Sequence, residues 1–279
     1  MTSIETTDDS EASELFWYDT HCHLFLESDP QRSPRTLMDR AEAVGVRRAV
    51  VVGIDPESST TAIELATEDP RLFASVGLHP NSCTRFDAAC RAALERLAQN
   101  PRVVGIGETG LDYYRMGADP SLQERSFRFH IELARQLQKT LIVHVRNAHL
   151  QARQVLRSEA EGHGLPRVVI HCFSGSLGDA LDYTSLGAYV SFAGPVTFRS
   201  RNAEALRQVV REIALNRVVI ETDSPFLSPH PYRGKPNEPA NVALVGKEIA
   251  ELKAMAVKEV AAITTANAIR LFGAPSGAG

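Results

Sequence analysis

The stretch "YDTHCHL", residues 18–24, places two histidines one residue apart at the end of the chain's first apolar run. Successive side chains of a β-strand point to opposite faces, so His21 and His23 would share one face and Cys22 would point to the other. Two imidazoles on one face can bind a divalent metal ion, but a complete site needs further ligands. Those ligands must come from other parts of the chain.

Five more side chains that can bind a metal ion or a phosphate stand near the ends of later apolar runs. Each has an ordinary structural explanation when it is taken alone. A single histidine at a strand end is more often a hydrogen-bonded core residue, and an aspartate ahead of a proline turn is often a helix cap. In chain order the five residues are His79, Glu108, His144, His171 and Asp223.

Eight short apolar runs, rich in valine and isoleucine, alternate with segments of helical periodicity. Such runs are typical of strands that are buried on both faces, as in a parallel sheet. Their number and the chain length predict an α/β fold, a single (β/α)8 TIM barrel; an open, doubly wound sheet is the alternative. "HCHLFLESD", after the first run, contains no glycine, which disfavours a dinucleotide-binding fold. The runs lie at 16–24, 47–54, 73–80, 102–112, 140–146, 167–174, 187–194 and 217–225.

In such a barrel the carboxyl ends of the strands meet at one mouth, where barrel enzymes have their active sites. All seven polar side chains would face this mouth, and buried carboxylates and imidazoles without partners are costly. We therefore predict a metal site at the C-terminal ends of the strands. One ion takes about four to six ligands, so six protein ligands indicate two divalent ions that share a bridge. Mixed imidazole and carboxylate ligands suit Zn or Mn, and Mg can be accommodated.

The composition limits the classes of partner and compartment. The 279 residues carry a formal net charge of −4, which excludes a broad basic surface for nucleic acid or anionic lipid. No apolar run is long enough to span a membrane, and residues 1–15 lack the basic start of a secretion signal. Four cysteines without a CxxC pair indicate a reducing compartment, so we predict a cytoplasmic protein without membrane association. Cys22 and Cys172 are expected to be core residues that face the helices.

The two ends of the chain differ from its middle in composition. Residues 1–15 are polar and acidic, and the last residues, "GAPSGAG", are small. We predict disordered tails at 1–15 and 273–279 on either side of one barrel domain at 16–272. After the eighth run, the proline-rich "SPFLSPHPYRGKPNEPAN" is too irregular for a helix and is expected to be a functional loop.

Seven motifs of the chain occur in the order in which one enzyme family has them: "YDTHCHL", "VGLHP", "GETGLDYYR", "VHVR", "HCFSG", "ETDSPFL" and "YRGKPNEP". With these motifs the chain resembles the TatD family of metal-dependent deoxyribonucleases, in the amidohydrolase-like barrel superfamily, over about residues 17–272. The resemblance implies a 3′-5′ exodeoxyribonuclease that hydrolyses DNA phosphodiesters. It also implies that His21, His23 and Asp223 bind one ion and His144 and His171 the other, with Glu108 as the bridge.

The resemblance leaves one alternative and two departures. Some members of the family are reported to cleave D-aminoacyl-tRNA, so a metal-dependent ester or amide hydrolase is the alternative function. Asn147 stands where the family often has Asp, and His130 stands where it usually has Gln. Neither residue is a predicted ligand.

The implied reaction assigns roles to the remaining candidates. Asp223 would orient the attacking water or take its proton, and Glu108 would fix the spacing of the ions, so both are predicted to be catalytic. The expected partner is DNA, single-stranded or at its 3′ ends, and the sequence indicates no obligate protein partner. The substrate phosphates need further cationic or donor groups. The predicted substrate contacts are His79, Arg146, Arg233, Lys235 and Asn237.

Overall fold

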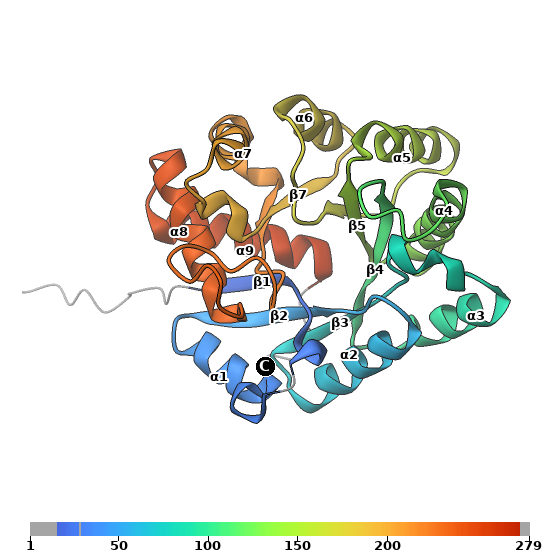
Figure 1. Cartoon of the computed structure of the whole chain (residues 1–279), viewed down its shortest axis with the longest axis horizontal. Helices are drawn as coiled ribbons and strands as arrows, with labels where there is room; N and C mark the ends of the chain where they lie inside the picture. The colour runs from blue at the N-terminus through green and yellow to red at the C-terminus, as the bar shows by residue number, and fades with distance from the viewer. Residues whose placement is uncertain (1–15, 28, 274–279) are drawn as a thin grey trace, which may run out of the picture.

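The computed structural model describes residues 16–27 and 29–273. Within these residues, eight parallel strands follow one another in chain order around a nearly closed barrel, and helices cover its outside (Figure 1). The predicted (β/α)8 barrel is confirmed, and the open, doubly wound sheet is wrong, because neighbouring strands pair in the order β1 to β8. The strands are β1 (Trp17–Cys22), β2 (Val46–Val52), β3 (Leu72–Val76), β4 (Val103–Asp112), β5 (Thr140–Arg146), β6 (Val168–Ile170), β7 (Tyr189–Phe192) and β8 (Val218–Ile220).

Serine and aspartate side chains start many of the helices. The carboxylate of Asp55 accepts the Ser58 N–H at 2.8 Å at the start of α2, and this bond satisfies an N–H that has no partner inside the helix. Such caps fix where each loop at the mouth ends and its helix begins. The helices are α1 (Pro34–Glu42), α2 (Pro56–Glu68), α3 (Ala88–Leu97), α4 (Pro120–Gln136), α5 (His149–His163), α6 (Leu177–Ser185), α7 (Arg201–Glu212), α8 (Val242–Lys253) and α9 (Val257–Phe272).

The chain that follows β8 closes the barrel against β1. The Asp223 N–H donates to the His21 carbonyl at 2.9 Å, and the His23 N–H donates to the Ser224 carbonyl at 2.7 Å. Just before this point, the buried Asp19 carboxylate accepts the Thr222 N–H at 2.8 Å. The bonds that join the two ends of the barrel therefore also fix the backbone of three predicted ligands.

Strands β6 and β8 are shorter than the runs from which the sequence predicts them. Runs 167–174 and 217–225 contain only three strand residues each, because Cys172 and Asp223 have φ of +41° and +56°. This left-handed backbone conformation ends a strand. The polar residues at the ends of these two runs thus lie on loops just beyond the strands.

The two cysteines that flank predicted ligands differ in backbone conformation and in burial. Cys22 is fully buried in the layer between strands and helices, as predicted, and its thiol donates to the Val50 carbonyl at 3.3 Å. Cys172 is only partly buried, and the strand alternation on which its prediction rests does not apply at φ +41°. The prediction that Cys172 packs against the helices is therefore wrong.

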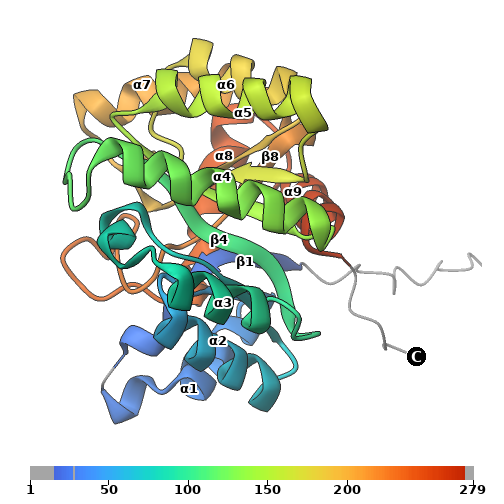
Figure 2. The same ribbon diagram turned by 90° about the vertical axis from the view of Figure 1, so that its right-hand side faces the viewer.

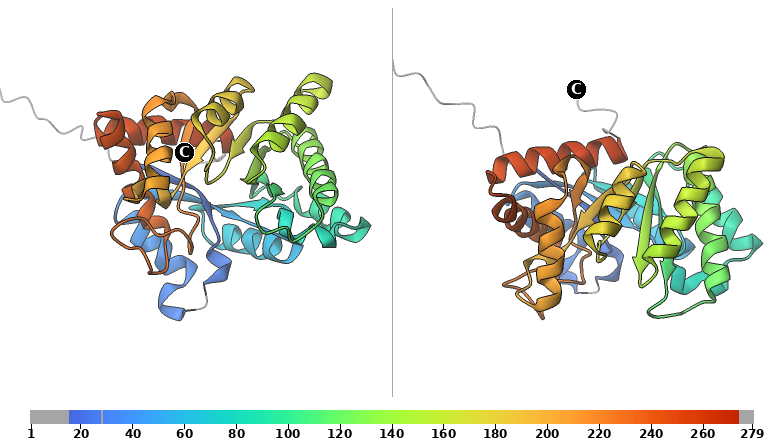
Figure 3. Two further views of the ribbon diagram at one scale, coloured as in Figure 1. Left: turned by 45° about the horizontal axis from the view of Figure 1, so that its top comes forward. Right: turned by 90° about the horizontal axis from the view of Figure 1, so that it is seen from above.

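Helix α9 covers the end of the barrel away from the loop that follows β8 (Figures 2 and 3). The ring of Phe272 lies 6.2 Å from that of Tyr18 inside the barrel, and the hydroxyl of Thr140 donates to the Leu271 carbonyl. Apolar side chains therefore fill this end of the barrel, and the polar groups collect at the opposite mouth.

No helix in the described ranges has the length and apolar character that crossing a membrane requires. The predicted tail at 1–15 and residues 274–279 of the predicted C-terminal tail lie outside the described residues.

Helix α8 packs closely on β1, so we predict that glycine-to-alanine substitutions in α8 and in α5 change stability in opposite directions. A Cβ atom at Gly246 would lie 2.3 Å from Cζ3 and 2.4 Å from Cη2 of the fully buried Trp17. We expect Gly246→Ala to lower the free energy of unfolding by about 1–3 kcal/mol, as overpacked cores do. Gly162→Ala in α5 is the control, because a Cβ there meets no atom within 4 Å, and it should raise stability by about 0.5–1 kcal/mol. Urea denaturation of both variants measures this, and effects of equal sign would contradict the packing.

Candidate metal centre

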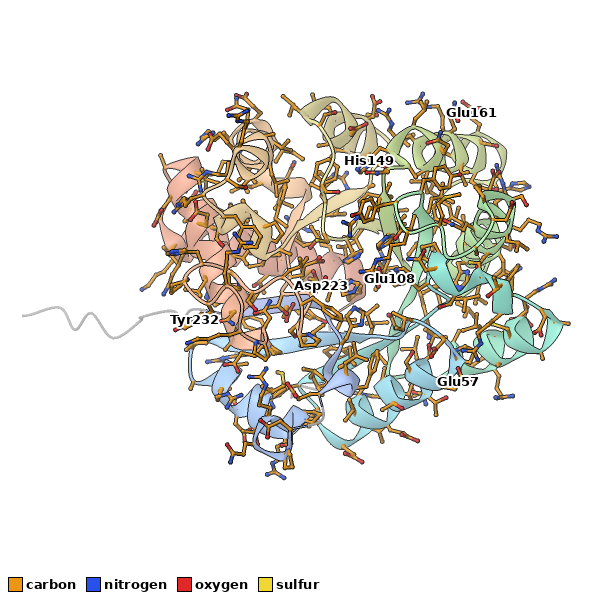
Figure 4. All side chains as sticks on the ribbon, viewed as in Figure 1. Glu57, Glu108, His149, Glu161, Asp223 and Tyr232 are labelled. Atoms are coloured by element: carbon orange, nitrogen blue, oxygen red, sulfur yellow. The ribbon has the colours of Figure 1, made fainter. Side chains whose placement is uncertain are left out.

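Glu108 and Asp223 lie near each other in the middle of the barrel (Figure 4). Histidines surround the carboxylate of Glu108. Its Oε1 is 2.7 Å from Nδ1 of His144 and 2.9 Å from Nε2 of His171. Its Oε2 is 3.4 Å from Nε2 of His21 and 3.8 Å from Nε2 of His23. The two oxygens of one carboxylate thus face two different pairs of imidazoles.

Asp223 supplies a second carboxylate to this cluster. Its Oδ1 lies 3.4 Å from Nε2 of His23 and 3.7 Å from Nε2 of His21. The structure therefore brings all six predicted ligands together, and His79 lies beside them. Within residues 16–27 and 29–273, three overlapping groups have donor atoms within 4.8 Å of one another: His21, His23 and Glu108; His21, His171 and Asp223; His79, Glu108 and His144.

The two histidines of β1 indicate that the cluster fits a cation. The Nδ1–H of His23 donates to the Val52 carbonyl at 2.8 Å, so Nε2 of the neutral ring carries a lone pair. This Nε2 lies 3.1 Å from Nε2 of His21, and both rings are buried. Among the described residues, Nδ1 of His21 has no hydrogen-bond partner. A divalent ion accepts imidazole nitrogens and carboxylate oxygens together, so it would satisfy the atoms that converge here.

Two carboxylates that the sequence analysis did not single out hold the outer sides of the ligand rings. Nε2 of His144 lies 3.3 Å from Oδ2 of Asp112, which also accepts from the Asn81 amide at 2.9 Å. Nδ1 of His171 lies 3.1 Å from Oε1 of Glu221. Such partners set the orientation of a ligand ring and raise its basicity. Their only signal in the sequence is an acidic residue at the end of an otherwise apolar run.

Burial raises the pKa values of the two carboxylates in the cluster, and the neighbouring histidines lower them. Burial raises the pKa of Glu108, but the imidazoles around it, that of His171 first, hold this pKa well below its usual range. Burial likewise raises the pKa of Asp223, and the contact with His23 brings it below its ordinary value. Both carboxylates are therefore charged at neutral pH. Two anions enclosed in one mouth favour the binding of cations there.

His79 is held in a form that suits a hydrogen-bond donor. Burial lowers its pKa to about 4, so the ring is neutral at pH 7. Its Nδ1 accepts the Asn81 N–H at 3.1 Å, which leaves the ring hydrogen on Nε2. Nε2 lies 3.6 Å from Oε1 of Glu108. His79 thus directs an N–H into the mouth, whereas a metal ligand would need a lone pair at that atom.

The predicted cationic contacts lie against aromatic rings. The guanidinium carbon of Arg146 lies 4.1 Å from the ring centre of Tyr114, which is 61% exposed. The guanidinium carbon of Arg233 lies 4.1 Å from that of Phe198. Both arginines are exposed, and cations in this position are attracted by the electron-rich face of the ring.

The side chain of Asn237 stabilises the loop that follows β8 from within. Its side chain is buried, and its amide donates to the carbonyls of Thr222 (2.9 Å) and Phe226 (2.8 Å). Its carbonyl oxygen accepts from the Glu238 N–H and the Asn241 amide, both at 2.9 Å. All of its hydrogen-bonding groups are thus engaged within the loop. Asn237 thus supports the loop beside Asp223, and its contact with substrate stays a prediction.

A profile of the protein family described as "TatD related DNase" matches residues 18–273. The chain belongs to this family. The uncharacterized metal-dependent hydrolase YabD of Bacillus subtilis is 41% identical over 256 residues, 91% of this chain and 98% of YabD. The uncharacterized metal-dependent hydrolase TatD of Mycobacterium tuberculosis is 39% identical over 262 residues, 91% of this chain and 97% of that protein. The 3′-5′ ssDNA/RNA exonuclease TatD of Salmonella typhimurium is 34% identical over 237 residues, 84% of this chain and 90% of that protein. The protein is therefore a metal-dependent hydrolase of the TatD family.

Solved structures agree with this assignment. The crystal structure of YJJV, a TatD homologue from Escherichia coli, superposes with a TM-score of 0.84 at 29% sequence identity, covering 93% of this chain and 98% of that one. A TatD family hydrolase of Entamoeba histolytica has the same fold, with a TM-score of 0.80 at 20% identity and coverage of 92% and 98%.

One departure from the TatD pattern has a structural role. His130, in α4, is fully buried, and burial lowers its pKa to about 4. Its Nε2 accepts the Leu78 N–H at 3.1 Å and its Nδ1–H donates to the Ser126 carbonyl at 2.7 Å. The neutral ring thereby fixes the start of the loop that carries His79, and it does not take part in the cluster.

Support of His171 by Glu221 leads to a prediction for this TatD protein. Glu221→Gln keeps the size of the side chain but removes its charge, so we expect metal affinity to fall by about 10- to 100-fold. Metal content per chain, measured after dialysis against buffered metal concentrations, checks this. Glu57→Gln is the control, because the Glu57 side chain is 68% exposed on α2. If Glu221→Gln kept the affinity of the parent protein, its carboxylate would not support a ligand.

Proposed function

We propose that this protein removes nucleotides from the 3′ ends of single-stranded DNA with a centre of two divalent ions. The observation that carries the proposal is the position of Glu108, whose Oε1 faces His144 and His171 while its Oε2 faces His21 and His23. A carboxylate between two ligand sets suits a bridge in two-ion phosphodiester hydrolysis. The Salmonella relative named as a 3′-5′ ssDNA/RNA exonuclease supports this class of substrate.

The protein's own groups would position the reactants. When bound, the ions supply neutralisation of the phosphate charge and a lower pKa for the attacking water. Asp223 lies on the His21 and His23 side of the cluster, and its backbone is hydrogen-bonded to β1. Its carboxylate would orient the water and take its proton. Glu108 would keep the two ligand sets at a fixed separation.

Groups at the edge of the cluster would hold the phosphates. The Nε2–H of His79 points into the mouth beside Glu108 and can donate to a non-bridging oxygen. Arg146, Arg233 and Lys235 are exposed cations on the loops around the mouth. Since the net charge of the chain is −4, these few contacts would carry the affinity for DNA.

Parallel assays on four substrates test the proposed reaction. The metal-loaded protein is offered 5′-labelled single-stranded DNA, duplex DNA, RNA and D-aminoacyl-tRNA, each with Mg²⁺, Mn²⁺ or Zn²⁺. We expect single-stranded DNA to shorten from its 3′ end about tenfold or more faster than duplex DNA, whose terminal bases must first unpair. Glu108→Gln should lose at least about 100-fold in kcat. Faster cleavage of D-aminoacyl-tRNA than of any nucleic acid would make the protein a deacylase instead.

Few phosphate contacts imply a shallow dependence on salt. Each neutralised phosphate contributes about −0.7 to the slope of log affinity against log salt for a single strand, so we expect a slope of roughly −1 to −3. Arg233→Ala should raise KM and flatten the slope by about one contact while metal content stays the same. Arg217→Ala is the control, because Arg217 also lies over a ring, at 5.0 Å from Tyr189, but at the opposite end of β8. Unchanged DNA kinetics for Arg233→Ala would show that this arginine does not contact substrate.

A further inference from the structure

A cleft of about 730 Å³ lies between α1 and α8, outside the metal centre. Its walls come from these two helices and from the loop at 232–241, and Figure 1 shows α1 and α8 on the same side of the barrel. The cleft is within the size range of sites that hold organic ligands. None of the ligand side chains of the cluster lines it.

Basic side chains outnumber acidic ones in this cleft. Arg32, Arg40, Lys235 and Lys247 line it together with a single acid, Glu238. Oε2 of Glu238 already accepts from Arg32 at 3.2 Å and from Arg40 at 2.8 Å. Among the described residues, neither lysine has a carboxylate partner. A chain with a net charge of −4 thus carries a local surplus of positive charge here.

Exposed apolar groups lie beside these cations. Tyr232 and Val44 both line the cleft and are 44% and 48% exposed. Nζ of Lys235 lies 6.0 Å from the ring centre of Tyr232. A positively charged groove that offers an exposed ring is the combination by which proteins bind unpaired nucleic-acid strands.

The loop that follows β8 runs along the chain from Asp223 at the metal centre to the residues at 232–241 that line the cleft. The Asn237 N–H donates to the Pro225 carbonyl at 3.0 Å, two residues from Asp223. Phe226 follows Pro225 in this loop. It is 52% exposed, and its ring lies 6.2 Å from that of His23. In Figure 4, Tyr232 lies outward from Asp223 on the side of α1 and α8. Exposed rings thus lie along the way from the ligand cluster to the cleft.

We propose that the cleft between α1 and α8 holds the part of a single-stranded nucleic acid that extends beyond the cleaved bond. This inference rests on the proposed function for the nature of the substrate. Lys235 and Lys247 contact the phosphates, and a base stacks on Tyr232. The site therefore favours long unpaired strands over short ones, with no preference for sequence, because every base has a face that stacks.

Other occupants fit the walls less well. A duplex keeps its bases paired and stacked on one another, so it offers no free base to Tyr232. An acidic peptide would meet the lysines but would leave the exposed ring without a planar partner. A mononucleotide would bridge one lysine and the ring, but it would not connect the cleft to the metal centre.

Dependence on strand length tests the cleft. Binding of a hydrolysis-resistant phosphorothioate 15-mer and of the matching trinucleotide is measured by fluorescence anisotropy, for the metal-loaded full chain. We expect Lys247→Glu to weaken 15-mer binding by about 5- to 10-fold and to change trinucleotide binding much less. Tyr232→Ala should weaken the 15-mer by about 5-fold or more. Lys258→Glu, the same charge change on exposed Lys258 of α9, is the matched control and should affect neither oligonucleotide.

The outcomes separate the cleft from the proposed reaction. Equal losses for Lys247→Glu and Lys258→Glu, or equal losses for both lengths, would overturn the cleft as a strand site. Displacement of the 15-mer by polyglutamate or by dAMP at matched concentration would make it a peptide or mononucleotide site instead. If 15-mer binding depends on Lys247 but the parent protein hydrolyses no oligonucleotide, the cleft stands and the proposed reaction fails.

Discussion

The charge of Glu108 is the constraint on which the rest of the mouth depends. A buried carboxylate is stable only if neighbouring groups compensate its lost hydration. Here imidazoles supply this compensation, and two of the rings contact a second carboxylate on their other side. His144 turns its second nitrogen to Asp112, and His171 turns its second nitrogen to Glu221. The buried charge of Glu108 is thus surrounded by imidazoles, and further carboxylates lie behind two of them. Polar groups therefore collect at this mouth, whereas apolar side chains fill the opposite end of the barrel.

The hydrogen bonds that close the barrel also hold residues of the ligand cluster. The hydrogen bonds from the Asp223 N–H to the His21 carbonyl and from the His23 N–H to the Ser224 carbonyl join the last segment of the barrel to the first. They also set the separation of three side chains of the cluster. Because assembly of the ligands and closure of the barrel use the same backbone, ions that bind only the folded chain add their binding free energy to its stability. The hydrogen bonds between β1 and the chain that follows β8 therefore serve both folding and the metal centre.

The sequence predicts those features that depend on periodicity and on the direction of parallel strands. The barrel, and the meeting of His21, Glu108 and Asp223 at one mouth, follow from these alone. The role of Asp112 does not, because an acid at the end of an apolar run gains its meaning only from the ring that it contacts. The prediction for Cys172 is wrong for another reason. The alternation of side chains requires an extended backbone, and a φ of +41° is not extended.

The loop that follows β8 shows that residue type alone does not reveal which side chains stabilise a loop and which face outward. Asn237 has the donors that a phosphate needs, but its amide stabilises the loop from within, whereas the neighbouring cations face outward. Arg233 lies over the ring of Phe198, as Arg146 does over that of Tyr114, so each site combines a planar cation with an aromatic ring. Such a surface attracts bases by stacking and phosphates by charge without reading base edges. Under the proposed function, an acidic protein would hold a strand through a few such local contacts.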